Sequence, residues 1–86
     1  MRVWGKIWKD GHMLRDTVAE DWSDDTRTYK IFRLLEAVSM EFDLEKPIWL
    51  DANISEFQKT SKTRFGQDSF IEQIPFDCLE FQVIEE

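Results

Sequence analysis

The sequence has few of the residues that most often carry catalysis, metal binding or phosphate binding. Its 86 residues include one cysteine (Cys78), one histidine (His12) and three glycines. A single cysteine excludes an intramolecular disulfide and fits a reducing compartment. Three glycines are too few for the Gly-rich loops that cradle phosphates.

Long apolar runs are also missing. No run approaches the ~18 residues that a membrane span requires, and the N-terminus lacks the basic and then apolar pattern of a signal peptide. We therefore expect a cytoplasmic protein that does not contact membranes.

Positive charge is scarce. The chain has 11 basic and 18 acidic residues, for a net charge of −7. Nucleic acids and anionic membranes attract positive charge, so we expect neither to be a general partner. The charge is uneven along the sequence. All charged residues within 16–25 and 68–86 are acidic, whereas the basic residues are concentrated near the N-terminus and at 59–64. Such a dipolar distribution can guide self-association or docking.

Apolar and aromatic residues, in contrast, are plentiful. Hydrophobic residues make up 42% of the chain and aromatic residues 14%, which is typical of a globular domain and argues against disorder. A chain of this length supplies one core, so we expect a single domain spanning residues 1–86.

Residues 2–19 predict a β-hairpin. Strands at 2–9 and 12–19 flank Asp10-Gly11, a dipeptide that suits the two positive φ angles of a type I′ turn. A two-residue turn then pairs Trp8 with Met13, and the pairing continues regularly to Val3 opposite Val18. Because side chains alternate along strands, one face is expected to carry Val3, Gly5, Ile7, Leu14, Asp16 and Val18. The other is expected to carry Trp4, Lys6, Trp8, Met13, Arg15 and Thr17.

The rest of the sequence predicts one long helix and two further strands. Helical periodicity over residues 25–43 aligns Ile31, Leu35, Val38 and Phe42, after Ser23, Asp24 and Asp25, which are all suited to N-capping. Residues 48–50 and 79–85 predict strands. Between them, residues 51–64 are polar and could form a helical turn or an irregular edge, and a short helix could run from Asp68 to Pro75.

These elements indicate an α+β domain. We expect an N-terminal β-hairpin, one long amphipathic helix, and then two further strands with a short helix or turn between them. The sheet should be mainly antiparallel, with the helix on its aliphatic face, where Gly5 leaves room for close approach. The face with Trp4 and Trp8 is also rich in apolar groups, so we expect another segment, a second copy or a partner to cover it.

Catalytic and metal sites are poorly supported. His12 follows the hairpin turn without an evident partner, and the acids beside Cys78 would raise the pKa of its thiol rather than lower it. The acids at 21–25 lack the glycine and the distal glutamate of a calcium loop, and N-capping explains them. We therefore expect a non-enzymatic protein with no catalytic residues, no metal and no cofactor.

The favoured hypothesis is a domain that binds another protein and self-associates, for example as a homodimer, through the tryptophan-bearing face of the sheet. Aromatic residues, Met and Arg are enriched at protein interfaces and often carry their binding energy. We therefore predict Trp4, Trp8 and Met13 as buried anchors, with Lys6 and Arg15 as polar contacts at the rim.

Two alternatives remain open. Aromatic and basic residues interleaved on an exposed sheet are used by proteins that bind single-stranded nucleic acid, and Trp4 and Trp8 would then stack on bases. The abundance of acids permits the inverse role, an acidic mimic of nucleic acid that inhibits a nucleic-acid-binding protein.

Five stretches resemble known sequences: residues 2–9 (RVWGKIWK), 25–28 (DTRT), 47–51 (PIWLD), 62–65 (KTRF) and 76–86. They resemble a group of short, uncharacterised bacterial proteins with no known activity. The resemblance covers most of the chain and implies a bacterial, cytoplasmic protein. It transfers no catalytic or binding residue.

Overall fold

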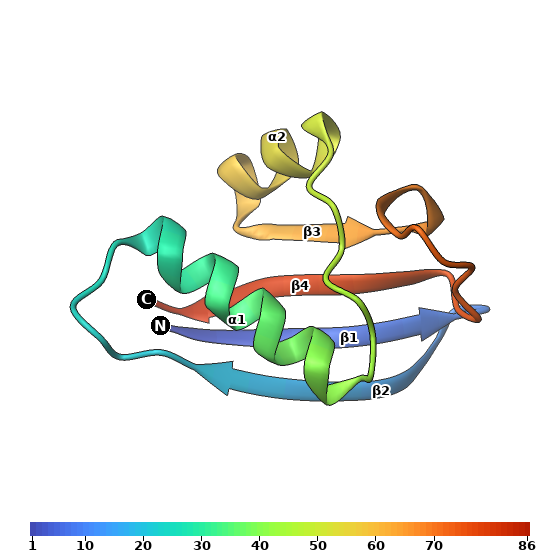
Figure 1. The fold of residues 1–86 in the computed structure, drawn as a ribbon, viewed down its shortest axis with the longest axis horizontal. Coiled ribbons are helices and arrows are strands. Elements are labelled where there is room, and N and C mark those ends of the chain that lie inside the picture. The colour runs from blue at the N-terminus through green and yellow to red at the C-terminus, as the bar shows by residue number, and fades with distance from the viewer.

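The computed structural model describes all residues from 1 to 86 as a four-stranded antiparallel sheet with two helices. The strands are β1 (Arg2–Lys9), β2 (His12–Glu20), β3 (Lys62–Phe65) and β4 (Cys78–Glu85), and the helices are α1 (Arg27–Glu41) and α2 (Asp51–Thr60). The strand order is β2-β1-β4-β3, which places β2 and β3 at the edges (Figure 1). The α+β class and the antiparallel sheet predicted from the sequence are confirmed.

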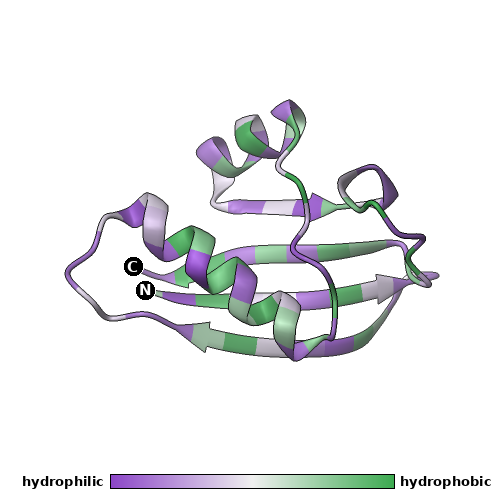
Figure 2. Cartoon of the chain, in the orientation of Figure 1, coloured by the Kyte–Doolittle hydropathy of each residue, from purple (hydrophilic) through white to green (hydrophobic).

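Helix α1 packs its predicted apolar line against the sheet. Ile31, Leu35, Val38 and Phe42 are all buried in the core, and Figure 2 shows apolar and polar residues alternating around the helix. The helix begins later than predicted, because Thr26 is its N-cap and accepts a hydrogen bond from the backbone N–H of Tyr29. Ser23, Asp24 and Asp25 therefore lie before the helix.

Gly5 sets the distance between α1 and the sheet. A Cβ built at this position would lie 2.4 Å from Cγ1 of Val38, which is closer than two non-bonded carbon atoms can approach. The predicted role of Gly5 in close approach is therefore confirmed.

The hairpin turn forms as predicted, but the strand pairing does not stay regular. Asp10 and Gly11 both have positive φ, at 50° and 76°, and Trp8 pairs with Met13. The register then shifts by one residue, so that Ile7 pairs with Arg15 and Leu14 becomes the extra residue of a β-bulge.

The bulge reverses the faces predicted for the rest of β2. Thr17 pairs with Gly5, and Val18 pairs with Trp4. Because directly paired residues share a face, Arg15 and Thr17 lie on the helix side, while Asp16 and Val18 lie on the tryptophan side. The regular register and the faces predicted for these four residues are wrong for this reason.

The third strand lies later in the chain than predicted. Residues 48–50 form no strand but belong to a segment that crosses over the sheet (Figure 1). Trp49 fills the core instead, with its ring edge-on to Phe57 and Phe65 at centroid distances of 5.4 and 4.9 Å. The ambiguous residues 51–64 form α2 and β3, and the short helix expected from Asp68 is only the 3-10 turn η1 (Gln67–Ser69).

Asn53 joins α2 to the strand that follows it. Its side-chain oxygen accepts the backbone N–H of Leu50 at the start of the helix. Its amide nitrogen donates to the hydroxyl of Thr63 and the carbonyl of Arg64, both at 2.9 Å. These bonds satisfy a buried amide and hold α2 over β3, on the same side of the sheet as α1.

We predict that Gly5→Ala lowers the free energy of unfolding by about 1–3 kcal/mol, because the added methyl group overpacks the contact with Val38. Gly66→Ala is the matched control, since its Cβ would meet only the Asp77 carbonyl oxygen, at 3.8 Å. We expect that control to change stability by less than about 0.5 kcal/mol. Urea denaturation measures both variants, and equal losses would contradict the close approach of β1 to α1.

Candidate protein-binding face

One side of the sheet is covered by neither helix. Both helices and the segment 42–50 lie on the opposite side (Figure 1), and the core forms between them and the sheet. We call the uncovered side the open face. Strand pairing assigns to it Arg2, Trp4, Lys6, Trp8, Met13, Asp16, Val18, Glu20, Lys62, Arg64, Cys78, Glu80 and Gln82.

Four of the five predicted site residues lie on this face. Trp4, Lys6 and Trp8 alternate along β1, and Met13 pairs directly with Trp8. Met13 is 44% exposed, whereas the two tryptophans are half-buried.

Arg15, the fifth predicted residue, lies on the opposite side of the sheet. Its guanidinium is 5.1 Å from the ring centroid of Phe42 and donates to the carbonyl of Glu41, at the end of α1. The prediction that Arg15 shares a face with the tryptophans is therefore wrong, because the bulge at Leu14 turns its side chain to the helix side.

The centre of the open face holds a buried ion pair. Lys6 donates to Glu80 at 2.8 Å, and the two side chains are only 11% and 4% exposed. Arg64 reaches the second oxygen of Glu80 at 3.0 Å from the neighbouring strand. Burial opposes ionisation of Glu80, but the hydrogen bonds from Lys6 and Arg64 outweigh it and lower the pKa of the carboxyl.

The sequence prediction missed Glu80. The strand predicted at 79–85 gives no indication that this carboxylate is buried. The available signal is its position between Leu79 and Phe81, in a strand apolar enough to lie inside the sheet with a paired strand along each edge.

The tryptophans are anchored by contacts within the chain. The ammonium of Lys6 lies 3.7 Å from the ring centroid of Trp4, and the indole N–H of Trp4 donates to Asp16 at 2.9 Å. The indole N–H of Trp8 is buried without a hydrogen-bond acceptor. Beside them, Val18 is 50% exposed and has no covering segment.

The two edges of the open face carry opposite charge. The β2 edge presents the carboxylates of Asp16 and Glu20, of which Glu20 is paired with Arg2 at 2.7 Å. The β3 edge presents the cations of Lys62 and Arg64. Arg64 remains 62% exposed despite its bond to Glu80, so both edges can interact with an approaching surface.

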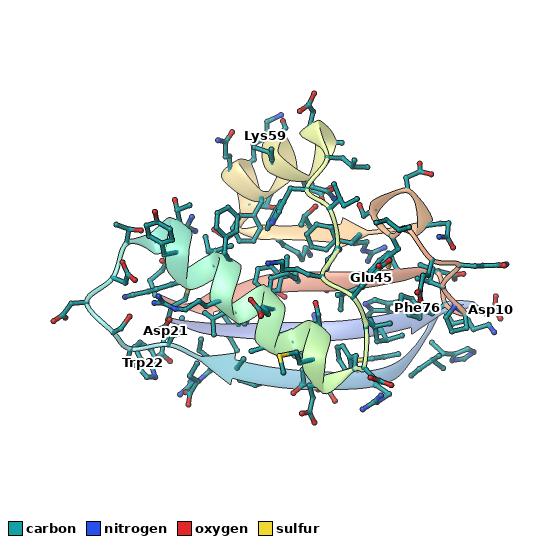
Figure 3. All side chains as sticks on the ribbon, viewed as in Figure 1. Asp10, Asp21, Trp22, Glu45, Lys59 and Phe76 are labelled. Carbon is teal, nitrogen blue, oxygen red and sulfur yellow. The ribbon has the colours of Figure 1, made fainter.

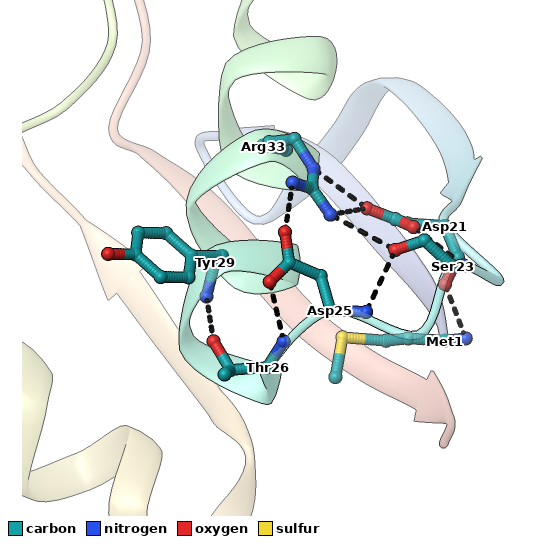
Figure 4. Close-up of polar contacts among 7 residues, drawn as sticks. All are labelled: Met1, Asp21, Ser23, Asp25, Thr26, Tyr29 and Arg33. Atoms are coloured by element: carbon teal, nitrogen blue, oxygen red, sulfur yellow. Dashed lines mark hydrogen bonds and ion pairs between the residues drawn. The ribbon is translucent and has the colours of Figure 1, made fainter.

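The acids at 21–25 serve a structural role at the start of α1. Arg33 donates to Asp21 at 2.8 Å and to Asp25 at 2.7 Å (Figure 4). Hydrogen bonds from Ser23 and Arg33 lower the pKa of the Asp21 carboxyl, and those from Arg33 and Thr26 lower the pKa of Asp25. This cluster joins the end of β2 to α1.

The remaining reactive residues form no chemical constellation. Burial raises the pKa of the Cys78 thiol, and Asp77 and Glu80 raise it further, in the direction that the sequence predicts. The structure holds no group of three or more His, Cys, Asp or Glu side chains arranged for a metal ion. None of its helices combines the length and apolarity needed to cross a membrane.

Comparisons with known proteins supply no similar protein from which to interpret the site, so its interpretation rests on its own geometry. No family model matches the chain, and searches of curated proteins and of solved structures find no match.

We predict that Lys6→Met lowers the free energy of unfolding by about 3 kcal/mol, because the substitution leaves a buried carboxylate without its closest partner. Arg64→Met removes the outer partner, which is largely exposed, and should cost about 1 kcal/mol or less. The double variant Lys6→Met/Glu80→Met should recover most of the loss. Urea denaturation of the three variants checks the order, and a neutral Lys6→Met would contradict it.

Because the pKa of Glu80 is lowered in the folded protein, its contribution to the free energy of unfolding should depend on pH. The ionised carboxylate stabilises the fold above the unfolded pKa of about 4.3, and this share is lost as pH falls through the lower folded pKa. Glu80→Gln cannot ionise. The stability difference between the natural protein and this variant should therefore shrink as the pH is lowered from about 6 towards 3, and a difference independent of pH would contradict the assignment.

Proposed function

We propose that this protein is a small, non-enzymatic protein-binding domain that associates with a second copy of itself through the open face. The observation that carries the proposal is the combination of a helix-free sheet face, two tryptophans at its centre and edges of opposite charge. We place the protein in the cytoplasm as part of the same proposal, because its only thiol is unpaired.

The strand pairing supports a particular arrangement of the two copies. One row across the open face consists of Arg64, Glu80, Lys6 and Asp16, and the next consists of Lys62, Gln82, Trp4 and Val18. A two-fold axis that lies between the two sheets and runs parallel to the strands brings β2 of one copy over β3 of the other. Each row of one copy then faces the same row of the second copy, in reverse order. Arg64 then faces Asp16 of the second copy, and Lys62 faces Val18 beside Glu20.

The same axis places the apolar centres together. β1 of one copy lies over β4 of the other, so that Trp4 faces Gln82 and Trp8 faces Cys78. Packed sheets lie about 10 Å apart with their strands within about 30° of each other. An axis perpendicular to the strands would instead place the acidic β2 edges over one another, which like charges disfavour.

The size of the face predicts a weak dimer. Strands of eight, nine, four and eight residues cover roughly 460 Å² at ordinary strand spacing, whereas a standard interface buries about 800 Å² of each partner. Association should therefore depend on protein concentration and on salt.

The contacts favour protein over nucleic acid as the partner of this face. Lys6, which a single-strand platform would present to phosphates, is buried and bonded to Glu80. Arg15 lies on the other side of the sheet. Among the acids that a nucleic-acid mimic would present, Asp21 and Asp25 are bound to Arg33.

We predict that Val18→Arg abolishes the dimer, because it places a third cation opposite Lys62 and Arg64 of the second copy. Adding Lys62→Glu in the same chain should restore it by creating an ion pair between copies. Val18 and Lys62 lie on opposite edges of the sheet, so this rescue cannot arise within one chain. Sedimentation equilibrium from micromolar to millimolar concentration measures the solution mass.

Ile71→Arg is the control for the dimer experiment. Ile71 is 83% exposed and lies outside the open face, so this substitution should leave the mass unchanged. Circular dichroism shows whether each variant keeps its fold. The dimer is excluded if the natural protein stays monomeric across the range, or if Val18→Arg with an intact fold leaves the mass unchanged.

A further inference from the structure

A groove lies on the helix side of the sheet, which is the side opposite to the open face. The groove has a volume of about 530 Å³ and lies where the end of α1, the bulge of β2 and the segment 70–76 meet. Ile7, Phe42 and Phe70 form its buried floor, and Leu14, Ile74 and Phe76 form its walls. This volume lies within the range of functional binding pockets.

The walls of the groove are apolar although they are accessible. Leu14 is 53% exposed, and Ile74 and Phe76 are half-buried. Leu14 is the extra residue of the bulge, and the register shift brings Arg15 to the helix side beside it at the edge of the groove. Figure 3 shows Glu45 and Phe76 towards the end of the sheet that carries the hairpin turn at Asp10.

The rim of the groove is acidic. Asp43, Glu45 and Glu72 are exposed at its margin, and Arg15 is the single base in the lining. Glu45 also fixes the segment that forms one wall, since its carboxylate accepts the backbone N–H groups of Ile71 and Glu72 at 2.7 and 3.1 Å. The wall formed by the segment 70–76 is therefore held in place by Glu45, and the rim of the groove carries an excess of negative charge.

We propose that this groove binds a basic amphipathic segment of another protein, with apolar side chains in the groove and Lys or Arg beside Asp43, Glu45 and Glu72. Helices of this kind commonly insert an apolar face into a groove on their partner. The acidic rim selects against acidic segments by like-charge repulsion and attracts basic ones. The net charge of −7 acts in the same direction.

Fluorescence anisotropy with labelled synthetic peptides tests the proposal. The probe is a helical peptide with leucines on one face and lysines on the other, and its counterpart has glutamate in place of every lysine. We expect the lysine peptide to bind at least ten-fold more tightly than the glutamate peptide. Equal binding of the two, or no binding of the lysine peptide, overturns the proposal.

Matched variants locate the peptide in the groove. Glu72→Lys should weaken binding several-fold, whereas Glu56→Lys, the same change on the exposed surface of α2, should alter it less than two-fold. Arg15→Met removes the one base and should tighten binding. Equal weakening by both lysine variants would show attraction to acidic surface in general and would overturn the proposal.

The apolar contribution has its own pair of variants. Leu14→Ser should weaken the lysine peptide at least five-fold, and Ile71→Ser, a change at a more exposed site, should not. If Leu14→Ser has no effect on peptide binding, or if it changes the solution mass of the protein alone, the groove is not the peptide site and the proposal is wrong.

Discussion

The β-bulge at Leu14 decides which chemistry each side of this protein presents. Without it, the alternation of β2 would place Arg15 beside the tryptophans and Asp16 under α1. With one extra residue, Asp16 and Val18 lie on the open face, and Leu14 and Arg15 lie at the groove. A single unpaired residue thus gives the open face its acidic edge and places Arg15, the one base in the lining of the groove, on the helix side.

The second constraint is the way in which α1 crosses the sheet. Its close approach to Gly5 fixes the distance between the helix and β1, and α1 continues across β2. Most residues of β2 nevertheless remain exposed, because it is an edge strand with one face uncovered. On the other side, the large side chains of Trp4 and Trp8 shield the ion pair of Lys6 and Glu80, although no helix lies above it. The centre of the open face is therefore organised by contacts within one chain, which would lower the entropic cost of the proposed association.

Features with strong local signals could be predicted from the sequence. The Asp10-Gly11 turn, the apolar line of α1 and the role of Gly5 each depend on a few residues whose physical requirements are specific. The strand predicted at 48–50 is wrong because an apolar triplet suits a strand and a crossing segment equally well, and only the packing of Trp49 against Phe57 and Phe65 separates them. β3 has only two buried side chains, Thr63 and Phe65, which is too short a pattern to recognise.

The candidate surfaces were less predictable for a related reason. Trp4, Lys6 and Trp8 share a face because they alternate along β1, and Met13 joins them because it pairs with Trp8 between the turn and the bulge. Arg15 lies beyond the bulge, and its position depends on how β2 and α1 fit together rather than on a local pattern. The groove is formed by three segments that are far apart in the chain, so no residue spacing in the sequence predicts it.

The side-chain contacts of Val18 test this account most directly. In solution, nuclear Overhauser effects between the Val18 methyl groups and the indole ring of Trp4 would place Val18 on the open face, as the bulged pairing requires. Contacts between the methyl groups of Val18 and Val3 would show a regular hairpin instead. That result would remove the acidic edge of the proposed interface and would place Arg15 beside the tryptophans instead of at the groove.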